Sequence, residues 1–306
     1  MDAPTAHDRV EPDRAVLSEL EPAADDAADD AVDDAAAVEP ADVVPHPVEP
    51  ARPESARLEP VEQALIDRLW DFADAGASAE RFRAASDDPT ATPVGRAVMA
   101  TQLARALGLQ GMADEGFQVL DAVPGVFDGD VPAEVRARVA LERGRLLVGE
   151  RPAEAVPELT LAARAAAQAG SVFLVLDALH VLALNDAGHE EEWAAEGLDL
   201  LEGRRNARTL RWGIALHHNL GWFKLDAGRA PGALAEFERA VEFADRYGSA
   251  EQQQVARWSV GRCLRVLGRT DEALDLQRSL AELRPDDPYV QAEIEALTAG
   301  EPTIEA

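Results

Sequence analysis

The sequence repeats itself at a spacing of 40 residues. Two stretches, which begin near residues 219 and 259, align without a gap and carry small residues at the same positions. The matched pairs are Gly221 with Gly261, Gly228 with Gly268, and Ala233 with Ala273. Weaker matches, at offsets of 38 to 40 residues, continue toward the N-terminus through Gly188, Ala155 and Gly116. Such a regular offset indicates stacked units, each of which buries its apolar face against the next unit.

Apolar residues within each unit recur at helical spacing. Leu234, Phe237 and Val241 lie at positions i, i+3 and i+7, whereas the alternation typical of strands is nearly absent. Glycines fall between the apolar runs, where a helix would end; examples are Gly111, Gly188, Gly228 and Gly268. The sequence therefore predicts an all-α protein made of helical hairpins.

Five hairpins share this plan. We predict them at residues 94–124, 132–169, 172–204, 208–248 and 251–284. A preceding hairpin within residues 61–90 is either a sixth, degenerate repeat or an N-terminal cap, in which Trp70 and Phe72 cover the first repeat. Pro288 to Leu297 predicts a C-terminal capping helix. We place Gln291, Glu293 and Glu295 on its polar outer face. The expected repeat domain spans residues 61–298, followed by a disordered C-terminus at 299–306.

Residues 94–285 resemble the tetratricopeptide repeat (TPR) family. The Leu-Gly step of that family matches Leu220-Gly221, and its Ala-x3-Phe step matches Ala233 and Phe237. The fifth hairpin matches more loosely, at Val260-Gly261, Ala273 and Pro285, and departures stand at Lys224, Leu264 and Gln277. The period of 40 also exceeds the usual value of about 34. The resemblance implies a right-handed α-solenoid of about five TPR-like hairpins with capping helices at both ends.

The resemblance also implies where a partner would bind. In this family the first helix of each hairpin lines a concave groove. On that face the candidate partner-binding residues are His218, Asn219, Trp222, Trp258, Arg262 and Arg265. Tryptophan offers rigid contact area and arginine binds carboxylates in a bidentate manner, so we expect a protein or peptide partner with an acidic end. The alternative is that both tryptophans pack between neighbouring helices.

We therefore expect a non-catalytic scaffold for protein–protein interaction. The alternative is a regulatory TPR protein that responds to a peptide or small molecule by changing the curvature of its groove. Dinucleotide, phosphate-loop and nucleophile-elbow motifs are absent from the sequence. His189 begins a zincin-like motif, but Trp193 stands where the second ligand should be, and adjacent His217 and His218 do not easily share an ion. We predict no enzyme activity, no cofactor and no metal.

The charge is strongly negative and uneven. The chain has 306 residues and a formal charge of −29, which makes nucleic acid an unsuitable main partner. Residues 1–60 alone carry 17 acids, 4 arginines and no aromatic residue other than His7 and His46. Such a segment predicts a disordered acidic tail, which is either a solubilising leader or a binding or self-inhibiting segment. One hypothesis is that Asp25 to Asp34 docks over Arg257, Arg262, Arg265 and Arg269.

Neither a secretory leader nor a membrane span is expected from the sequence. The longest apolar run, Ala165 to Leu176, falls short of the roughly 18 residues that a membrane-spanning helix needs. A single cysteine, Cys263, excludes an internal disulfide. We expect a cytoplasmic protein, monomeric or weakly dimeric, that binds neither nucleic acid nor membrane. A single lysine among 29 basic residues suggests a high-GC bacterial source.

Overall fold

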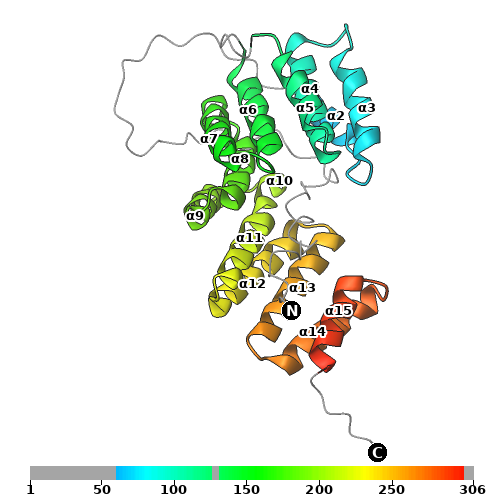
Figure 1. Ribbon diagram of the computed structural model, residues 1–306, viewed down its shortest axis with the longest axis vertical. Helices are drawn as coiled ribbons and strands as arrows, with labels where there is room; N and C mark the ends of the chain where they lie inside the picture. Colours follow the sequence, from blue (N-terminus) through cyan, green and yellow to red (C-terminus); the bar gives the residue numbers. More distant parts are fainter. Residues whose placement is uncertain (1–59, 126–130, 300–306) are drawn as a thin grey trace, which may run out of the picture. The chain divides into compact units, whose positions relative to one another are not determined.

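The computed structural model describes residues 60–125 and 131–299. Within these ranges every regular element is a helix and no strand is present, which confirms the all-α prediction (Figure 1). The predicted acidic tail overlaps the described chain only at Pro60, and most of the predicted disordered C-terminus also lies outside it. No helix in the described part has the length and apolar character needed to cross a bilayer.

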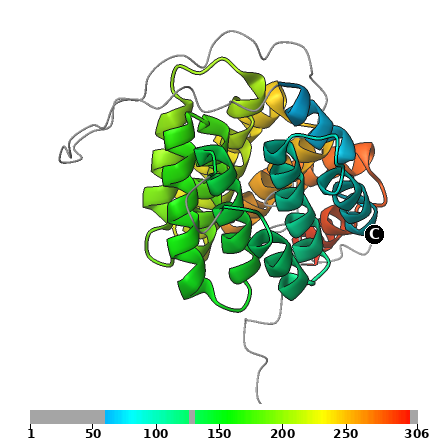
Figure 2. The ribbon, with the colours of Figure 1, turned by 90° about the horizontal axis from the view of Figure 1, so that it is seen from above.

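The helices follow one another with short connections. Their bounds are α2 Pro60–Leu69, α3 Ala75–Ser86, α4 Pro93–Leu109, α5 Ala113–Asp121, α6 Ala133–Leu147, α7 Pro152–Ala169, α8 Val172–Asn185, α9 Glu190–Leu201, α10 Ala207–Leu210, α11 Trp212–Asp226, α12 Ala230–Tyr247, α13 Ala250–Val266, α14 Thr270–Leu283 and α15 Pro288–Thr298. Each of the five predicted hairpin ranges spans two long consecutive helices. Within a unit, the two helices of a hairpin pack side by side, as α6 and α7 do (Figure 1 and Figure 2).

The described chain divides into two compact units. The N-terminal unit holds the described residues up to His189 together with Glu202–Thr209. The C-terminal unit holds Glu190–Leu201 and the described residues from Leu210 onward. The third predicted hairpin, 172–204, is therefore divided: α8 belongs to the N-terminal unit and α9 to the C-terminal unit.

Turn glycines end the first helix of several hairpins, as predicted. Gly228 and Gly268 have φ of 72° and 74°, a left-handed conformation that a residue with a Cβ adopts only with strain. Gly111 and Gly188 are also left-handed. The repeated glycines are therefore explained by backbone conformation at the turn.

A second set of glycines lets paired helices touch. A Cβ on Gly221 would lie 2.6 Å from the ring of Phe237, and a Cβ on Gly261 would lie 2.5 Å from Nε2 of Gln277. The small Ala233 and Ala273, at the start of the second helices, are completely buried. The fourth and fifth hairpins are thus closed by the same close approach of a large side chain to a glycine.

The core of the N-terminal unit begins at α2 and α3. Trp70 stacks on Phe72 with ring centroids 4.6 Å apart, and it meets the buried Phe82 edge-on. The indole Nε1 of Trp70 donates a hydrogen bond to Oε1 of Gln102 on α4, at 2.8 Å. Trp70 therefore covers apolar residues of the first hairpin, while Phe72 remains partly exposed above it.

Candidate partner-binding surface

The candidate surface lies on one side of α13 in the C-terminal unit. Gln254, Trp258, Arg262 and Arg265 follow one another at helical spacing, so their side chains share a face. The start of α13 is fixed by a capping box: Ser249 Oγ accepts from Gln252 N, and Gln252 Oε1 accepts from Ser249 N. The capping box fixes the residue at which α13 begins, and this determines which side of the helix the four face residues occupy.

The C-terminal helix α15 lies against this face. Asp287 caps α15 by accepting hydrogen bonds from the backbone of Tyr289 and Val290, and Pro288 occupies the first turn, where no N–H is required. The other carboxylate oxygen of Asp287 accepts from Nε2 of Gln254 at 2.6 Å. The residue that starts α15 therefore also attaches it to α13.

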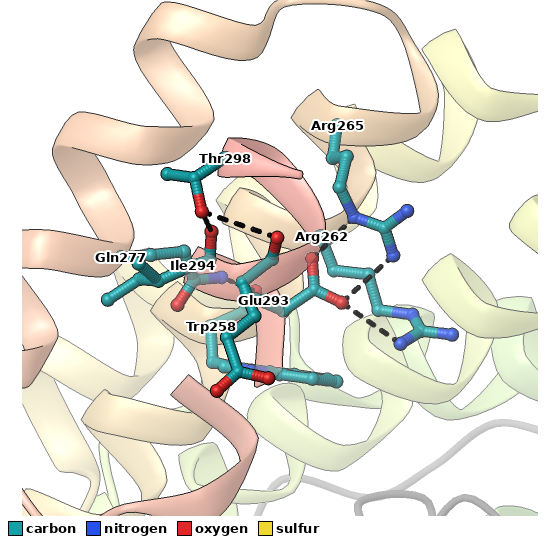
Figure 3. Close-up of polar contacts among 8 residues, drawn as sticks. Trp258, Arg262, Arg265, Gln277, Glu293, Ile294 and Thr298 are labelled. Carbon is teal, nitrogen blue, oxygen red and sulfur yellow. Dashed lines mark hydrogen bonds and ion pairs between the residues drawn. The ribbon is translucent and has the colours of Figure 1, made fainter. Parts of the chain in front are cut away.

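Glu293 of α15 is held by Arg262 and Arg265, here called the arginine pair (Figure 3). Arg265 donates from Nε to Oε2 at 2.6 Å and from Nη2 to Oε1 at 2.9 Å, which is the bidentate geometry. Arg262 donates from Nη1 to Oε1 at 3.1 Å. The Glu293 side chain is only 4% exposed, whereas those of Arg262 and Arg265 are 26% and 32% exposed. A buried carboxylate is thus covered by two arginines that reach the surface.

Aromatic rings form the other side of this site. The guanidinium carbon of Arg262 lies 5.6 Å from the ring centroids of both Trp222 and Trp258. Trp258 also meets Tyr289 of α15 edge-on, with centroids 6.4 Å apart. The guanidinium of Arg262 therefore lies against indole rings and binds a carboxylate, so both its π face and its N–H groups are used.

Four of the predicted partner-binding residues lie inside the helical layer. His218, Asn219, Trp222 and Trp258 are all buried. Nε2 of His218 accepts the indole N–H of Trp222 at 3.0 Å and lies 2.9 Å from Oγ of Ser259 on α13. This placement corresponds to the alternative in which the tryptophans pack between neighbouring helices. A role for these four residues in binding stays a prediction.

Glu293 was placed wrongly by the sequence interpretation. We expected it on the polar outer face of the capping helix, yet it is buried, while Gln291 and Glu295 are exposed as expected. The spacing contains the signal, because Glu293 lies three residues after Val290 and four before Leu297, and both of these are buried. An acid at an apolar position of a helical pattern indicated a buried partner of opposite charge.

The arginines proposed as a docking surface for the acidic tail already form ion pairs in the structure. Arg257 pairs with Asp245 at 2.5 Å and Arg269 with Glu272 at 2.6 Å, while the arginine pair holds Glu293. All four arginines named for tail docking therefore face carboxylates of their own unit. The docking segment itself, Asp25 to Asp34, lies outside the described residues.

A charged cluster in the N-terminal unit was not predicted. Arg145 donates to Glu142 at 2.6 Å and also pairs with Asp177, and Arg105 lies 4.0 Å from Glu142. Glu142 and Asp177 are buried, and the cluster connects α4, α6 and α8, the first helices of successive hairpins. The available signal was Asp177, a single acid within the otherwise apolar run of α8.

Two other potentially reactive side chains, those of His217 and Cys263, lie against neighbouring residues of the C-terminal unit. Nδ1 of His217 lies 2.8 Å from Glu236 Oε2, and Nζ of Lys224 donates to Glu236 Oε1 at 2.6 Å. Burial raises the pKa of the Cys263 thiol to about 11, and the nearby Glu238 adds to this effect. Among the residues that the structure describes, no group of three or more His, Cys, Asp or Glu side chains is arranged to hold a metal ion.

The chain matches no protein-family model and no curated protein sequence.

Proposed function

We propose that this chain is a non-catalytic scaffold that binds a protein or peptide partner by holding an acidic group of that partner. We further propose that its hairpins stack into a right-handed α-solenoid of the TPR type. The repeated glycine contacts at Gly221 and Gly261 support this architecture, because they build two successive hairpins in the same way. The arrangement at the arginine pair carries the binding proposal.

The arginine pair is suited to a carboxylate ligand. It already binds one carboxylate in bidentate geometry, and indole rings beside it restrict where Arg262 can lie. A pre-positioned guanidinium loses less conformational entropy on binding than a freely moving one. We infer that a partner places an Asp, a Glu or a terminal carboxylate against this pair, with apolar residues beside it.

The charge of the chain supports a protein partner over nucleic acid. The formal charge of −29 repels phosphate backbones, so binding to nucleic acid would need a large local basic surface. We propose a soluble, cytoplasmic protein that is monomeric or weakly dimeric and requires no cofactor.

The test is peptide selection against the full chain, followed by affinity measurement on two variants. The first carries Glu293→Gln, which leaves the arginine pair in place. The second adds Arg262→Ala and Arg265→Ala to it, so that no buried carboxylate is left without its partners. We expect enrichment of peptides that contain Asp or Glu, and at least about tenfold weaker binding to the second variant.

A matched control is Arg239→Ala with Arg246→Ala in the Glu293→Gln background, because both arginines are exposed on α12 of the same unit. This control tests whether any loss comes from net charge alone. Equal affinity of the selected peptides for the chains with and without the arginine pair would overturn the proposal.

A further inference from the structure

We propose that α15 occupies the partner's place on α13 as an internal competitor, and that the partner is an amphipathic helix with a carboxylate at the position of Glu293. This inference rests on the proposed function and specifies its ligand. In this proposal α15 does more than cover the last hairpin: it blocks the partner's site on α13 until it is displaced.

Contacts between α13 and α15 advance in the same order along both helices. Gln254 meets Asp287, Trp258 meets Tyr289, and further along the arginine pair meets Glu293. The two helices therefore run in the same direction, and α15 covers the α13 face from Gln254 to Arg265. Figure 3 shows Glu293 directed toward the arginine pair and away from Gln277. The surface proposed for a partner and the surface covered by α15 are thus the same surface.

The residues that α15 buries describe the ligand. Val290, Glu293 and Leu297 lie at positions i, i+3 and i+7 and are buried, while Gln291 and Glu295 are exposed. The helix thus presents an apolar residue, an acid one turn later, and a second apolar residue one turn after that. A helix of another protein with this pattern could place its acid against the arginine pair and its apolar residues in the cluster that Val290 and Leu297 share with α13 and α14.

The ion pairs at Glu293 select a ligand more than they stabilise the fold. Burying a carboxylate costs desolvation free energy that the arginines largely offset, so the net contribution of such a pair to stability is small. A helix without an acid at this position would lack the hydrogen bonds that the arginine pair donates to Glu293. The arginine pair therefore discriminates between helices that have a carboxylate here and helices that lack one.

Displacement of α15 is physically feasible. The helix has 11 residues, fewer than an isolated helix needs to be stable in water, so its order depends on contacts with α13 and α14. It is the last helix of the described chain, and four residues, 284–287, connect it to α14. A short helix that is held by two neighbouring helices opens at a lower free energy than the remainder of a fold.

The test uses the full chain and a labelled synthetic peptide of residues 286–299 as the probe. The wild-type chain should bind it weakly, because its own α15 is present at high effective concentration. Glu293→Gln should weaken the internal contact and raise affinity for the probe at least about tenfold. The control is Glu295→Gln, which removes the same charge from an exposed position of α15 and should leave affinity at the wild-type value.

A second variant protects the test against a folding artefact. Leu297→Ala removes buried apolar contact from α15 without touching the arginine pair, and it should also raise affinity for the probe. The melting temperature of each variant shows that folded chains are being compared. A probe in which glutamine replaces the residue equivalent to Glu293 should bind every chain weakly.

The inference is overturned if both Glu293→Gln and Leu297→Ala bind the probe no more tightly than Glu295→Gln does. In that case α15 is a fixed cap. Such a result would leave the proposed function intact, provided that selected acidic peptides still distinguish the chains with and without the arginine pair.

Discussion

Gln277 packs directly on Gly261, with Nε2 only 2.5 Å from the point where a Cβ would stand. Forty residues earlier in the sequence, Phe237 packs on Gly221 in the same way. The two hairpins therefore share a contact whose glycine is retained although its large partner has changed from an aromatic ring to an amide. Because the contact is so close, the addition of a single methyl group at either glycine should change the stability of its hairpin.

Gly221→Ala should destabilise the protein by about 1–3 kcal/mol, because the new methyl group would overlap the ring of Phe237 in a packed core. Gly261→Ala should cost less, since Gln277 is a flexible side chain that can move aside. The measurement is the free energy of unfolding from chemical denaturation. Gly232→Ala is the control: its Cβ would meet Lys224 at an ordinary 3.5 Å, so the helix preference of alanine should stabilise α12 by up to about 1 kcal/mol. Equal effects at the three glycines would contradict the proposed role of the close contacts.

Gln277→Met should raise the free energy of unfolding by roughly 0.5–1 kcal/mol. Nε2 of Gln277 donates only a long, 3.3 Å hydrogen bond to Trp258 O, and its buried Oε1 has no hydrogen-bond partner among the described residues. Methionine has a similar length and removes the desolvation cost of the amide. The converse substitution, Phe237→Gln, should destabilise by several kcal/mol, because it buries an amide where a ring fills the core. A loss of stability in Gln277→Met would show that the amide makes a stronger contact than its geometry indicates.

Glu236 should make the stability of the C-terminal unit sensitive to acid. Burial alone would raise the pKa of this carboxyl, but hydrogen bonds from His217 and Lys224 outweigh burial and hold the pKa below its usual value. A carboxyl with a lowered pKa stabilises the folded state above its unfolded pKa, and that stabilisation is lost as pH falls through the folded pKa. The difference in unfolding free energy between wild type and Glu236→Gln should therefore shrink as the pH is lowered from 7 toward 3.

Chemical denaturation at a series of pH values measures this difference. Glu238→Gln, at an exposed position of the same helix, reports the effect of removing one acid from a highly negative chain. If the difference in unfolding free energy between wild type and Glu236→Gln stays constant down to the lowest pH at which the protein is folded, the contacts with His217 and Lys224 do not stabilise the carboxylate.

Local features of the fold could be predicted from the sequence, because periodicity and glycine placement depend on neighbouring residues. Gly228 and Gly268 are left-handed at the predicted turns, and Ala233 and Ala273 are buried at the predicted contacts. The burial of Glu293 was also accessible, since it interrupts an apolar pattern at helical spacing. Its exposure was expected only because a polar outer face is usual for a terminal helix.

Contacts between hairpins could not be predicted in this way. Glu142, Arg145 and Asp177 meet because α6 and α8 stack in one register, and no local pattern specifies that register. The ion pair of Arg262 is a second contact that no local pattern specifies. We expected this side chain to bind a partner protein, but it already binds Glu293. Helical spacing was enough to place Arg262 and Arg265 on one face of α13, but it did not indicate Glu293 as their acidic neighbour, and a role for the two arginines in binding stays a prediction.

Removal of the arginine pair should destabilise the fold more than removal of exposed arginines does, although the net contribution of the intact ion pairs to stability is small. Arg262→Ala with Arg265→Ala leaves a buried carboxylate without these partners, which in a fully buried site would cost about 3–5 kcal/mol. Because the arginine side chains are about one third exposed, solvent screening should reduce this to about 2 kcal/mol. Glu293→Gln alone should cost less, and adding it to the arginine variant should restore at least about 1 kcal/mol. A double-mutant cycle of unfolding free energies measures this coupling, and strictly additive losses would mean that Glu293 and the arginine pair stabilise the fold independently.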